Sequence, residues 1–231
     1  MHRIHKNPEQ RIEVIGFDLD GTLIYTNRDF QYVAFATTMK EFGIIPTDEK
    51  FDQFSFEDRR AWVNVNIPGV SSRQVIDSYW KKMSPEETAA NTHVYPDAVE
   101  CLKYLTSNDK QIALVTANKK ENAIVTLTKT GLISYFADKL IIGGRDIIGN
   151  VIPKYLGIKK LVESIEVNPA SVAYIGDLPI DVEAARNAGV YDTLLFRGDG
   201  INTIPKDLNP SLVLSSLEEI VKENIFVDYT L

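Results

Sequence analysis

Two aspartates stand two residues apart in VIGFDLDGTLIYT, residues 14–26, directly after a hydrophobic run. Residues i and i+2 of a strand point to the same side. The carboxylates of Asp18 and Asp20 would therefore project together where the strand ends and Gly21 allows a turn. Carboxylates this close repel each other unless a positive group lies between them. Taken alone, the pattern is explained equally well by an ordinary strand-to-loop turn built on Asp-Gly.

A second acidic stretch, YIGDLPIDVEAARNAG at 174–189, repeats the step from an apolar strand to Gly-Asp. Ligands of open parallel sheets bind at the carboxyl ends of the strands, so Asp177 is expected beside Asp18 and Asp20. Three carboxylates that meet in one place are a ligand set for Mg²⁺. Asp181 could be a further ligand, a residue that orients the ligands, or an acid in the first turn of a helix.

Two other stretches could bind an anion beside such a metal. LVTAN, residues 114–118, ends a strand at Thr116. The Thr116 hydroxyl could bind a phosphate oxygen together with Ala117 and Asn118, or it could cap the helix that follows. Lys154, in NVIPKYLGIKKL, would open a helix and could neutralise both a nucleophilic carboxylate and a transferring phosphoryl group. The alternative for Lys154 is a solvated surface lysine.

The elements that would position these residues alternate between apolar strands and helical patterns. This alternation predicts an α/β fold, with a Rossmann-like three-layer core in which helices cover a mostly parallel sheet. We expect strands at 13–19, 111–117, 139–144, 171–177 and 192–197, and helices at 97–106, 119–130, 155–166, 179–188 and from Ser216 onward.

Residues 27–93 interrupt this alternation, because they show helical patterns and no strand pattern. The stretches 28–43 and 71–83 both place apolar residues near helical spacing. We therefore expect an all-helical domain at 27–93, inserted into a core domain that is formed by residues 1–26 and 94–231.

The composition narrows the class of protein. The 231 residues are 44% hydrophobic and 25% charged, enough for an α/β domain with a small inserted domain. A net charge of −7 argues against nucleic acid and anionic membranes as partners, although a small phosphate ester needs only local positive charge. The single cysteine, Cys101, excludes an intrachain disulfide and a cysteine zinc cluster. Because the sequence shows no apolar leader and no spanning segment, we expect a cytoplasmic protein. We expect it to be a monomer or a homodimer.

Together, these motifs resemble those of the haloacid dehalogenase (HAD) superfamily. FDLDGTL resembles its first motif, DxDGT, and VTAN resembles its second, a strand that ends in Thr or Ser. Lys154 resembles the third motif and GDLPID the fourth, GDxxxD. The place of the helical segment resembles the cap domain of the subgroup that includes phosphoglycolate phosphatase-like enzymes and β-phosphoglucomutase. Two positions depart from the pattern: Lys154 follows a proline rather than preceding one, and Leu178 stands where a small polar residue is common.

The resemblance implies a mechanism. Asp18 would attack phosphorus and form an aspartyl-phosphate, while Asp20 would protonate the leaving alkoxide and later accept a proton from water. Mg²⁺ would be held by Asp18, the main-chain carbonyl of Asp20, and Asp177. Thr116 and Lys154 would hold the other phosphoryl oxygens.

Asp20 separates the reactions known within this family. A halide leaves without a proton, whereas an alkoxide needs one, so an acid at this position favours phosphoryl transfer over dehalogenation. We therefore expect a Mg²⁺-dependent phosphatase that hydrolyses a small phosphorylated metabolite. A sugar phosphomutase is the nearest alternative, and a catalytically silent binding protein with the same fold is a third.

Overall fold

The computed structural model describes residues 11–56, 59–144, 153–197 and 204–227. The chain divides into two compact units. One unit is formed by Met1–Tyr25 together with Val94–Leu231, and the other by Thr26–His93. The first unit combines strands and helices, and the second is mainly helical.

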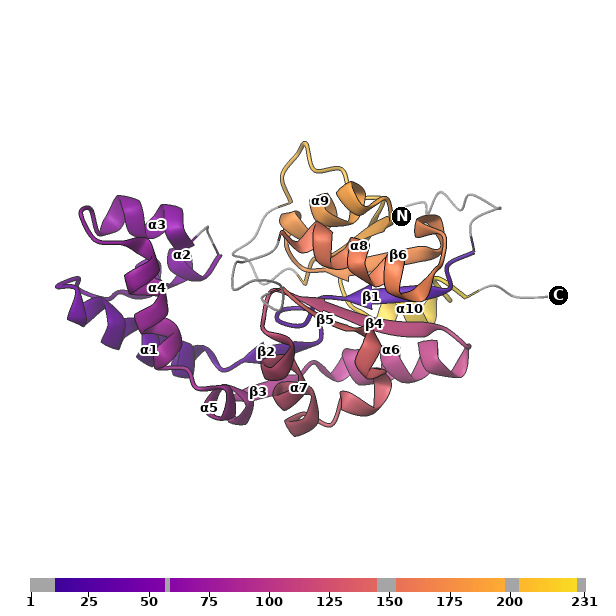
Figure 1. Ribbon diagram of the computed structural model, residues 1–231, viewed down its shortest axis with the longest axis horizontal. Coiled ribbons are helices and arrows are strands. Elements are labelled where there is room, and N and C mark those ends of the chain that lie inside the picture. The colour runs from indigo at the N-terminus through magenta and orange to yellow at the C-terminus, as the bar shows by residue number, and fades with distance from the viewer. Residues whose placement is uncertain (1–10, 57–58, 145–152, 198–203, 228–231) are drawn as a thin grey trace. The chain divides into compact units, whose positions relative to one another are not determined.

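A six-stranded sheet in the order β5-β4-β1-β6-β7-β8 runs through the first unit (Figure 1). Every neighbouring pair of strands is parallel. Strands β1 and β6 are buried over their whole length, as expected where helices cover both faces of a parallel sheet. The strands are β1 (Val14–Phe17), β4 (Gln111–Thr116), β5 (Ile141–Gly143), β6 (Val172–Gly176), β7 (Tyr191–Leu195) and β8 (Leu212–Leu214).

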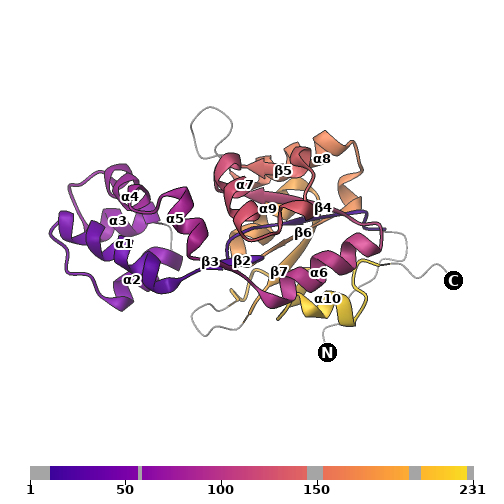
Figure 2. The same cartoon turned by 90° about the horizontal axis from the view of Figure 1, so that it is seen from below.

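Helices pack on both faces of this sheet, so the unit has three layers with the sheet in the middle. Helices α6, α7 and α10 contribute to the core on one face, and α8 and α9 to the core on the other (Figure 1). Helices α6 and α10 lie side by side in both views (Figures 1 and 2). The predicted α/β fold is therefore confirmed. The helices are α6 (Pro96–Ser107), α7 (Lys120–Lys129), α8 (Lys154–Ile165), α9 (Pro179–Ala188) and α10 (Glu218–Lys222).

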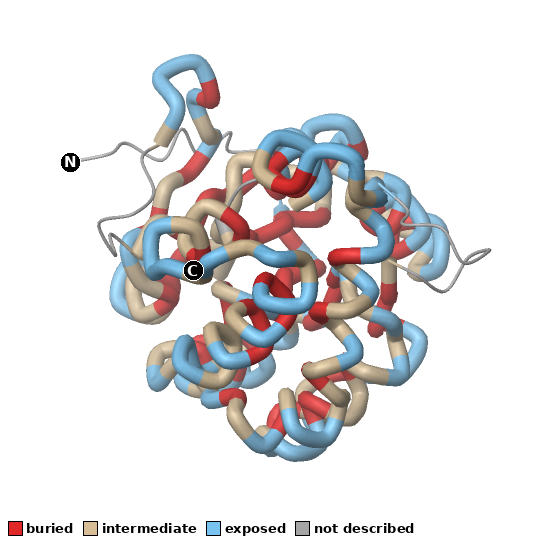
Figure 3. Tube along the Cα trace, turned by 90° about the vertical axis from the view of Figure 1, so that its left-hand side faces the viewer, coloured by how far each residue is buried: buried red, intermediate tan, exposed pale blue. Residues whose placement is uncertain are grey.

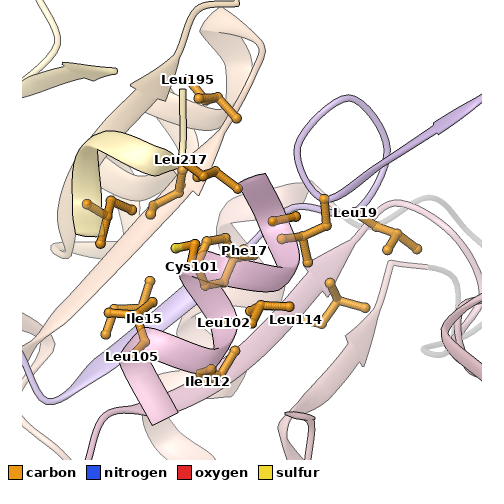
Figure 4. Close-up of a cluster of buried hydrophobic side chains, with 14 of the residues drawn as sticks. Ile15, Phe17, Leu19, Cys101, Leu102, Leu105, Ile112, Leu114, Leu195 and Leu217 are labelled. Atoms are coloured by element: carbon orange, nitrogen blue, oxygen red, sulfur yellow. The ribbon is translucent and has the colours of Figure 1, made fainter. Parts of the chain in front are cut away.

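Alternate residues of the central strands supply the two cores. Ile15 and Phe17 of β1 pack with Leu102 of α6 on one face, as the close-up in Figure 4 shows. Val14 of the same strand belongs to the cluster under α8 and α9, on the opposite face. Cys101 is fully buried in the first cluster, among apolar side chains. Figure 3 shows how buried and exposed stretches alternate along the chain.

The helical unit has its own aromatic core. The ring of Phe54 lies 5.4 Å from that of Trp62 and 5.2 Å from that of Tyr79, measured between centroids. Phe54 and Tyr79 are almost completely buried, so this unit holds itself together by apolar packing independent of the sheet. Its helices are α1 (Arg28–Glu41), α2 (Asp48–Phe56), α3 (Arg59–Asn66), α4 (Ser72–Lys81) and α5 (Pro85–Ala90).

Two short strands lie where the chain enters and leaves this helical segment. Strands β2 (Ile24–Thr26) and β3 (Thr92–Val94) pair as a two-stranded sheet, and the Thr26 and Thr92 hydroxyl oxygens are 3.0 Å apart. The expectation that 27–93 contains no strand is therefore wrong at its end, because β3 begins at Thr92. A strand of three residues is too short to show an alternating pattern, and its partner is far away in the sequence.

Within the part of the chain that the structure describes, every helix is too short or too polar to cross a membrane.

Candidate active site

The first acidic motif forms a tight loop at the end of β1. The N–H of Asp18 donates to the carbonyl of Ile175 on β6 at 2.9 Å, which holds the buried aspartate against the neighbouring strand. The following residues fold back, because the N–H of Ile24 donates to Leu19 O at 3.1 Å. Gly21 has φ +81°, and a Cβ at this position would lie 2.2 Å from Asp177 Oδ2. Only glycine therefore allows both the turn and the approach of the second acid.

Three carboxylates meet at the carboxyl ends of β1 and β6. Asp18, Asp177 and Asp181 each offer an oxygen, and these oxygens all lie within 4.8 Å of one another. Asp18 and Asp177 come from adjacent parallel strands, in the arrangement that the spacing of the motifs predicts. Asp20 is not part of this group: its side chain is exposed, and its Oδ2 accepts a hydrogen bond from Asn118 Nδ2 at 2.7 Å.

Lys154, the first residue of α8, places its ammonium inside the acidic group. Its Nζ lies 3.1 Å from Asp18 Oδ2 and is also paired with Asp181 Oδ1. The Lys154 side chain is 11% exposed, so the alternative of a solvated surface lysine does not describe this position. One ammonium thus faces three carboxylates.

Asp181 is completely buried, and both of its oxygens have partners. Oδ1 accepts from Lys154, while Oδ2 accepts from the N–H of Leu178 at 3.0 Å, at the start of α9. A Cβ on residue 176 would lie 2.3 Å from Asp181 Cγ, so Gly176 makes room for this side chain. These contacts suit a residue that orients the lysine and begins the helix better than a direct metal ligand.

Thr116 ends β4, and its hydroxyl does not cap the next helix. The N–H of Asn118 donates to Thr116 Oγ1 at 3.2 Å, and the N-cap of α7 is Lys119, which has no side-chain cap bond. Because Thr116 Oγ1 is the acceptor in this bond, its own hydrogen can be donated to an anion. The main chain of Ala117 passes beside Gly144, where a Cβ would lie 3.0 Å from Ala117 Cα.

Two residues that the sequence analysis did not single out support the acidic group. Thr22 Oγ1 donates to Asp177 Oδ1 at 3.1 Å, and Arg197 donates to the Thr22 carbonyl at 3.1 Å. The guanidinium of Arg197 also pairs with Asp97 and stacks 3.8 Å from the centre of the Tyr95 ring. Thr22 is the last residue of DGT and could have been found from that motif, whereas Arg197 carries no local signal.

Among the residues that the structure describes, the acidic group holds three carboxylates around the one ammonium of Lys154. Burial raises the pKa of Asp18 to about 8, with Lys154 opposing the shift and the neighbouring acids adding to it. Burial, together with Asp181, raises the pKa of Asp177 to about 7. Burial is the largest effect on Lys154 and disfavours its ammonium, but Asp18, Tyr174 and Asp181 together outweigh burial, and the pKa of Lys154 rises. Oxygen donors that ionise reluctantly fit a hard divalent cation, which would favour their charged forms.

The chain is similar in sequence to known proteins. The family model described as haloacid dehalogenase-like hydrolase matches residues 15–194. A phosphoglycolate phosphatase of Aquifex aeolicus is 26% identical over 194 residues, which cover 81% of this chain and 86% of that protein. Phosphoglycolate phosphatase 1 of Pseudomonas aeruginosa is 28% identical over 217 residues, which cover 90% and 78%.

Solved structures share the fold. A haloacid dehalogenase-like family hydrolase from Streptococcus pneumoniae superposes with a TM-score of 0.77 at 18% identity and covers 92% of this chain and 98% of that one. A HAD family hydrolase from Deinococcus radiodurans, crystallised with bound phosphate and sodium, gives 0.70 at 16% identity and covers 95% and 99%. At these identities the likeness shows the fold alone.

Proposed function

The chain belongs to the haloacid dehalogenase-like hydrolases, and from that premise we propose that it is a Mg²⁺-dependent phosphatase of small phosphate esters. The observation that carries this proposal is the group at the ends of β1 and β6. There, the carboxylates of the buried Asp18 and the half-buried Asp177 lie together with the ammonium of Lys154. The names of the curated relatives support phosphate-ester hydrolysis as the reaction class.

Asp18 is the nucleophile in this proposal. One of its carboxylate oxygens attacks phosphorus, the bond from phosphorus to the ester oxygen breaks, and an aspartyl-phosphate forms. The ester oxygen takes its proton from Asp20. Water then attacks the same phosphorus and gives a proton to Asp20, and the bond to Asp18 breaks to release inorganic phosphate.

Other side chains hold the phosphoryl group and the nucleophile. Lys154 binds Asp18 at 3.1 Å and is close enough to the nucleophile to meet a phosphoryl oxygen bound there. Thr116 can donate its hydroxyl hydrogen to a second phosphoryl oxygen. The main chain of Ala117 and Asn118 would bind the phosphoryl group beside it. Asp181 keeps the ammonium of Lys154 in place.

Mg²⁺ would be held by Asp18, Asp177 and the main-chain carbonyl of Asp20. The hydrogen bonds that close the loop after β1 use the main-chain groups of Leu19, Gly21, Leu23 and Ile24, and they hold the loop beside Asp18. When bound, the cation shields the charge of the nucleophile from the phosphate and stabilises the charge of the transition state.

The relatives suggest the first substrate to test, 2-phosphoglycolate. We further propose that the helical segment 27–93 is the cap domain, which selects the substrate, while the core formed by 1–26 and 94–231 carries out the chemistry. A phosphomutase would use the same nucleophile, so the products decide between the two activities.

The decisive experiment measures phosphate release from a panel of 2-phosphoglycolate, sugar phosphates and p-nitrophenyl phosphate. We expect release with Mg²⁺ and none with EDTA. Asp18→Asn should abolish turnover and leave the circular dichroism spectrum unchanged, while Asp207→Asn, at an exposed acid, should behave as the unsubstituted protein. Full activity of Asp18→Asn, or isomerised sugar phosphate without free phosphate, would contradict the proposal.

A further inference from the structure

The side chain of Asn118 reaches across to the loop after β1. Its Nδ2 donates to Asp20 Oδ2 at 2.7 Å, although the two residues are 98 positions apart in the sequence. The distance is at the short end of the range for N–H···O bonds. Sequence reasoning places Asn118 among the groups that bind phosphate, whereas here its amide is directed to the acid.

The main chain of Asn118 is held on both sides. Its N–H donates to Thr116 Oγ1 at 3.2 Å, and its carbonyl accepts from the N–H of Gly144 at 3.0 Å. Gly144 can come this close because it has no Cβ: a Cβ there would lie 3.0 Å from Ala117 Cα and 3.1 Å from Thr116 O. The side-chain amide is therefore presented from a fixed point at the carboxyl end of β4.

The loop after β1 fixes the main chain beside Asp20 but does not orient its side chain. The N–H of Gly21 donates to Ile24 O at 2.8 Å, which fixes the backbone on one side of the aspartate. This bond does not restrict the side-chain torsions of Asp20, whose carboxylate lies outside the cluster of Asp18 and Asp177. An acid that must deliver a proton to one oxygen needs a defined orientation, because a small misplacement costs rate.

We propose that Asn118 is a positioning residue for Asp20, an inference that rests on the proposed phosphatase activity. An amide N–H on Oδ2 makes that oxygen an acceptor, so the proton of the acid resides on Oδ1. Oδ1 then gives this proton to the ester oxygen as the phosphorus–oxygen bond breaks, and the carboxylate that remains keeps its bond to Asn118. In the second step, Oδ1 takes the proton from the attacking water and the starting state returns.

Leaving groups separate this role from phosphate binding. An alkoxide needs a proton as it departs, whereas p-nitrophenolate is a stable anion that departs without one. A residue that orients the acid therefore matters for alkyl phosphates and little for p-nitrophenyl phosphate. A residue that binds the phosphoryl group matters equally for both. The quantity to compare is kcat/KM, which covers the steps up to formation of the aspartyl-phosphate.

The test uses Asn118→Ala and the isosteric Asn118→Asp, which cannot donate to an ionised Asp20. For the best alkyl phosphate of the panel we expect kcat/KM to fall about 10-fold or more, and for p-nitrophenyl phosphate less than about 3-fold, since general acid catalysis serves the first substrate alone. Glu121→Ala, at an exposed residue in the first turn of α7, the helix that follows Asn118, is the matched control and should change neither value.

A double-mutant cycle provides the second readout. If Asn118 acts through Asp20, then adding Asn118→Ala to Asp20→Asn should lower kcat/KM for the alkyl phosphate by less than about 2-fold, because the two residues work as one unit. Equal losses on both substrates, no loss on either, or full additivity in the cycle would overturn the inference while leaving the phosphatase proposal intact. If the unsubstituted protein releases no phosphate from any ester, both proposals fall together.

Discussion

Two carboxylates of the sheet-containing unit lie beside a cation, and their pKa values move in opposite directions. Asp18 is 3.1 Å from Lys154, and its side chain is 9% exposed; Asp97 is 2.9 Å from Arg197, and its side chain is 13% exposed. Yet the pKa of Asp18 is raised to about 8, whereas the pKa of Asp97 is lowered. Proximity to one cation therefore does not decide in which direction the pKa of an acid moves.

Burial acts more strongly on Asp18 than on Asp97, and the two charges also differ in the number of their partners. Asp97 accepts two hydrogen bonds from Arg197, one from Ser216 Oγ at 2.7 Å and one from the N–H of Leu217 at 2.9 Å. Burial raises its pKa, but these donors outweigh burial. Asp18 instead shares one ammonium with two more acids. A complete set of partners stabilises a fold, and an incomplete set leaves a place for a ligand.

The strongest test of this comparison is the pair Asp177→Asn and Asp97→Asn. Asp177→Asn should lower kcat/KM by about 1000-fold or more, because it removes a proposed metal ligand. Losses of this size follow when a group that acts mainly in the transition state is removed. Without metal, its stability should not fall, since one of three crowded charges disappears. Asp97→Asn should instead cost about 2 kcal/mol of unfolding free energy, because Arg197 loses its partner.

Phosphate release and urea unfolding in EDTA check both variants. Mg²⁺ should raise the unfolding midpoint of the unsubstituted protein and of Asp97→Asn, but not that of Asp177→Asn. A destabilised Asp177→Asn that still gains stability from Mg²⁺ would contradict the inference that Asp177 binds a ligand whereas Asp97 stabilises the fold.

Asp181 shares one feature with Asp18 and another with Asp97. It belongs to the acidic group, yet both of its oxygens have partners, as those of Asp97 do. Asp181→Asn keeps a group that can accept from Leu178 but no longer holds Lys154 by charge. We expect kcat to fall about 10- to 100-fold, the usual loss when a residue that orients a site is changed. Mg²⁺ should still shift the unfolding midpoint, and failure of that shift would make Asp181 a metal ligand.

Two glycines allow the comparison between the acidic group and the rest of the fold to be tested by adding a single methyl group. Gly21 and Gly131 both have positive φ, +81° and +77°, but a Cβ on Gly21 would meet Asp177 at 2.2 Å, whereas a Cβ on Gly131 would meet nothing within 4 Å. Gly131→Ala should therefore cost about 1 kcal/mol of backbone strain and leave activity unchanged. Gly21→Ala carries the same strain and also displaces Asp177, so we expect activity to fall about 10-fold, as misplaced site residues do. Equal activity in the two variants would show that the approach of Asp177 to Gly21 has no catalytic importance.

Local patterns were enough to predict five of the six strands and the acids at the carboxyl ends of two of them. The runs before Asp18 and Asp177 are apolar, end in acidic residues and lie on parallel strands, so the adjacency of β1 and β6 follows from simple rules of α/β folds. Pairings between distant side chains could not be predicted this way. Asn118 with Asp20, and Arg197 with Asp97, depend on the register of β4 and on where β7 ends. Strand β8, with three residues at the edge of the sheet, is too short for a pattern.

The smallest expected effect is the pH dependence of the Asp97–Arg197 pair. A folded-state pKa below the ordinary 3.8 means that the unfolded chain binds protons more readily than the native one near that pH. The pair therefore contributes its full stability above pH 3.8 and loses it as the pH falls through the folded-state value. The stability difference between the unsubstituted protein and Asp97→Asn should be constant from pH 7 to 5 and shrink by about 0.5 kcal/mol at pH 3.5, the acid end of the range. Urea unfolding in EDTA at pH 7, 5, 4 and 3.5 measures this difference. A difference that instead grows as the pH falls would show that Asp97, like Asp18, is more easily protonated in the folded chain, and the contrast between the two regions would disappear.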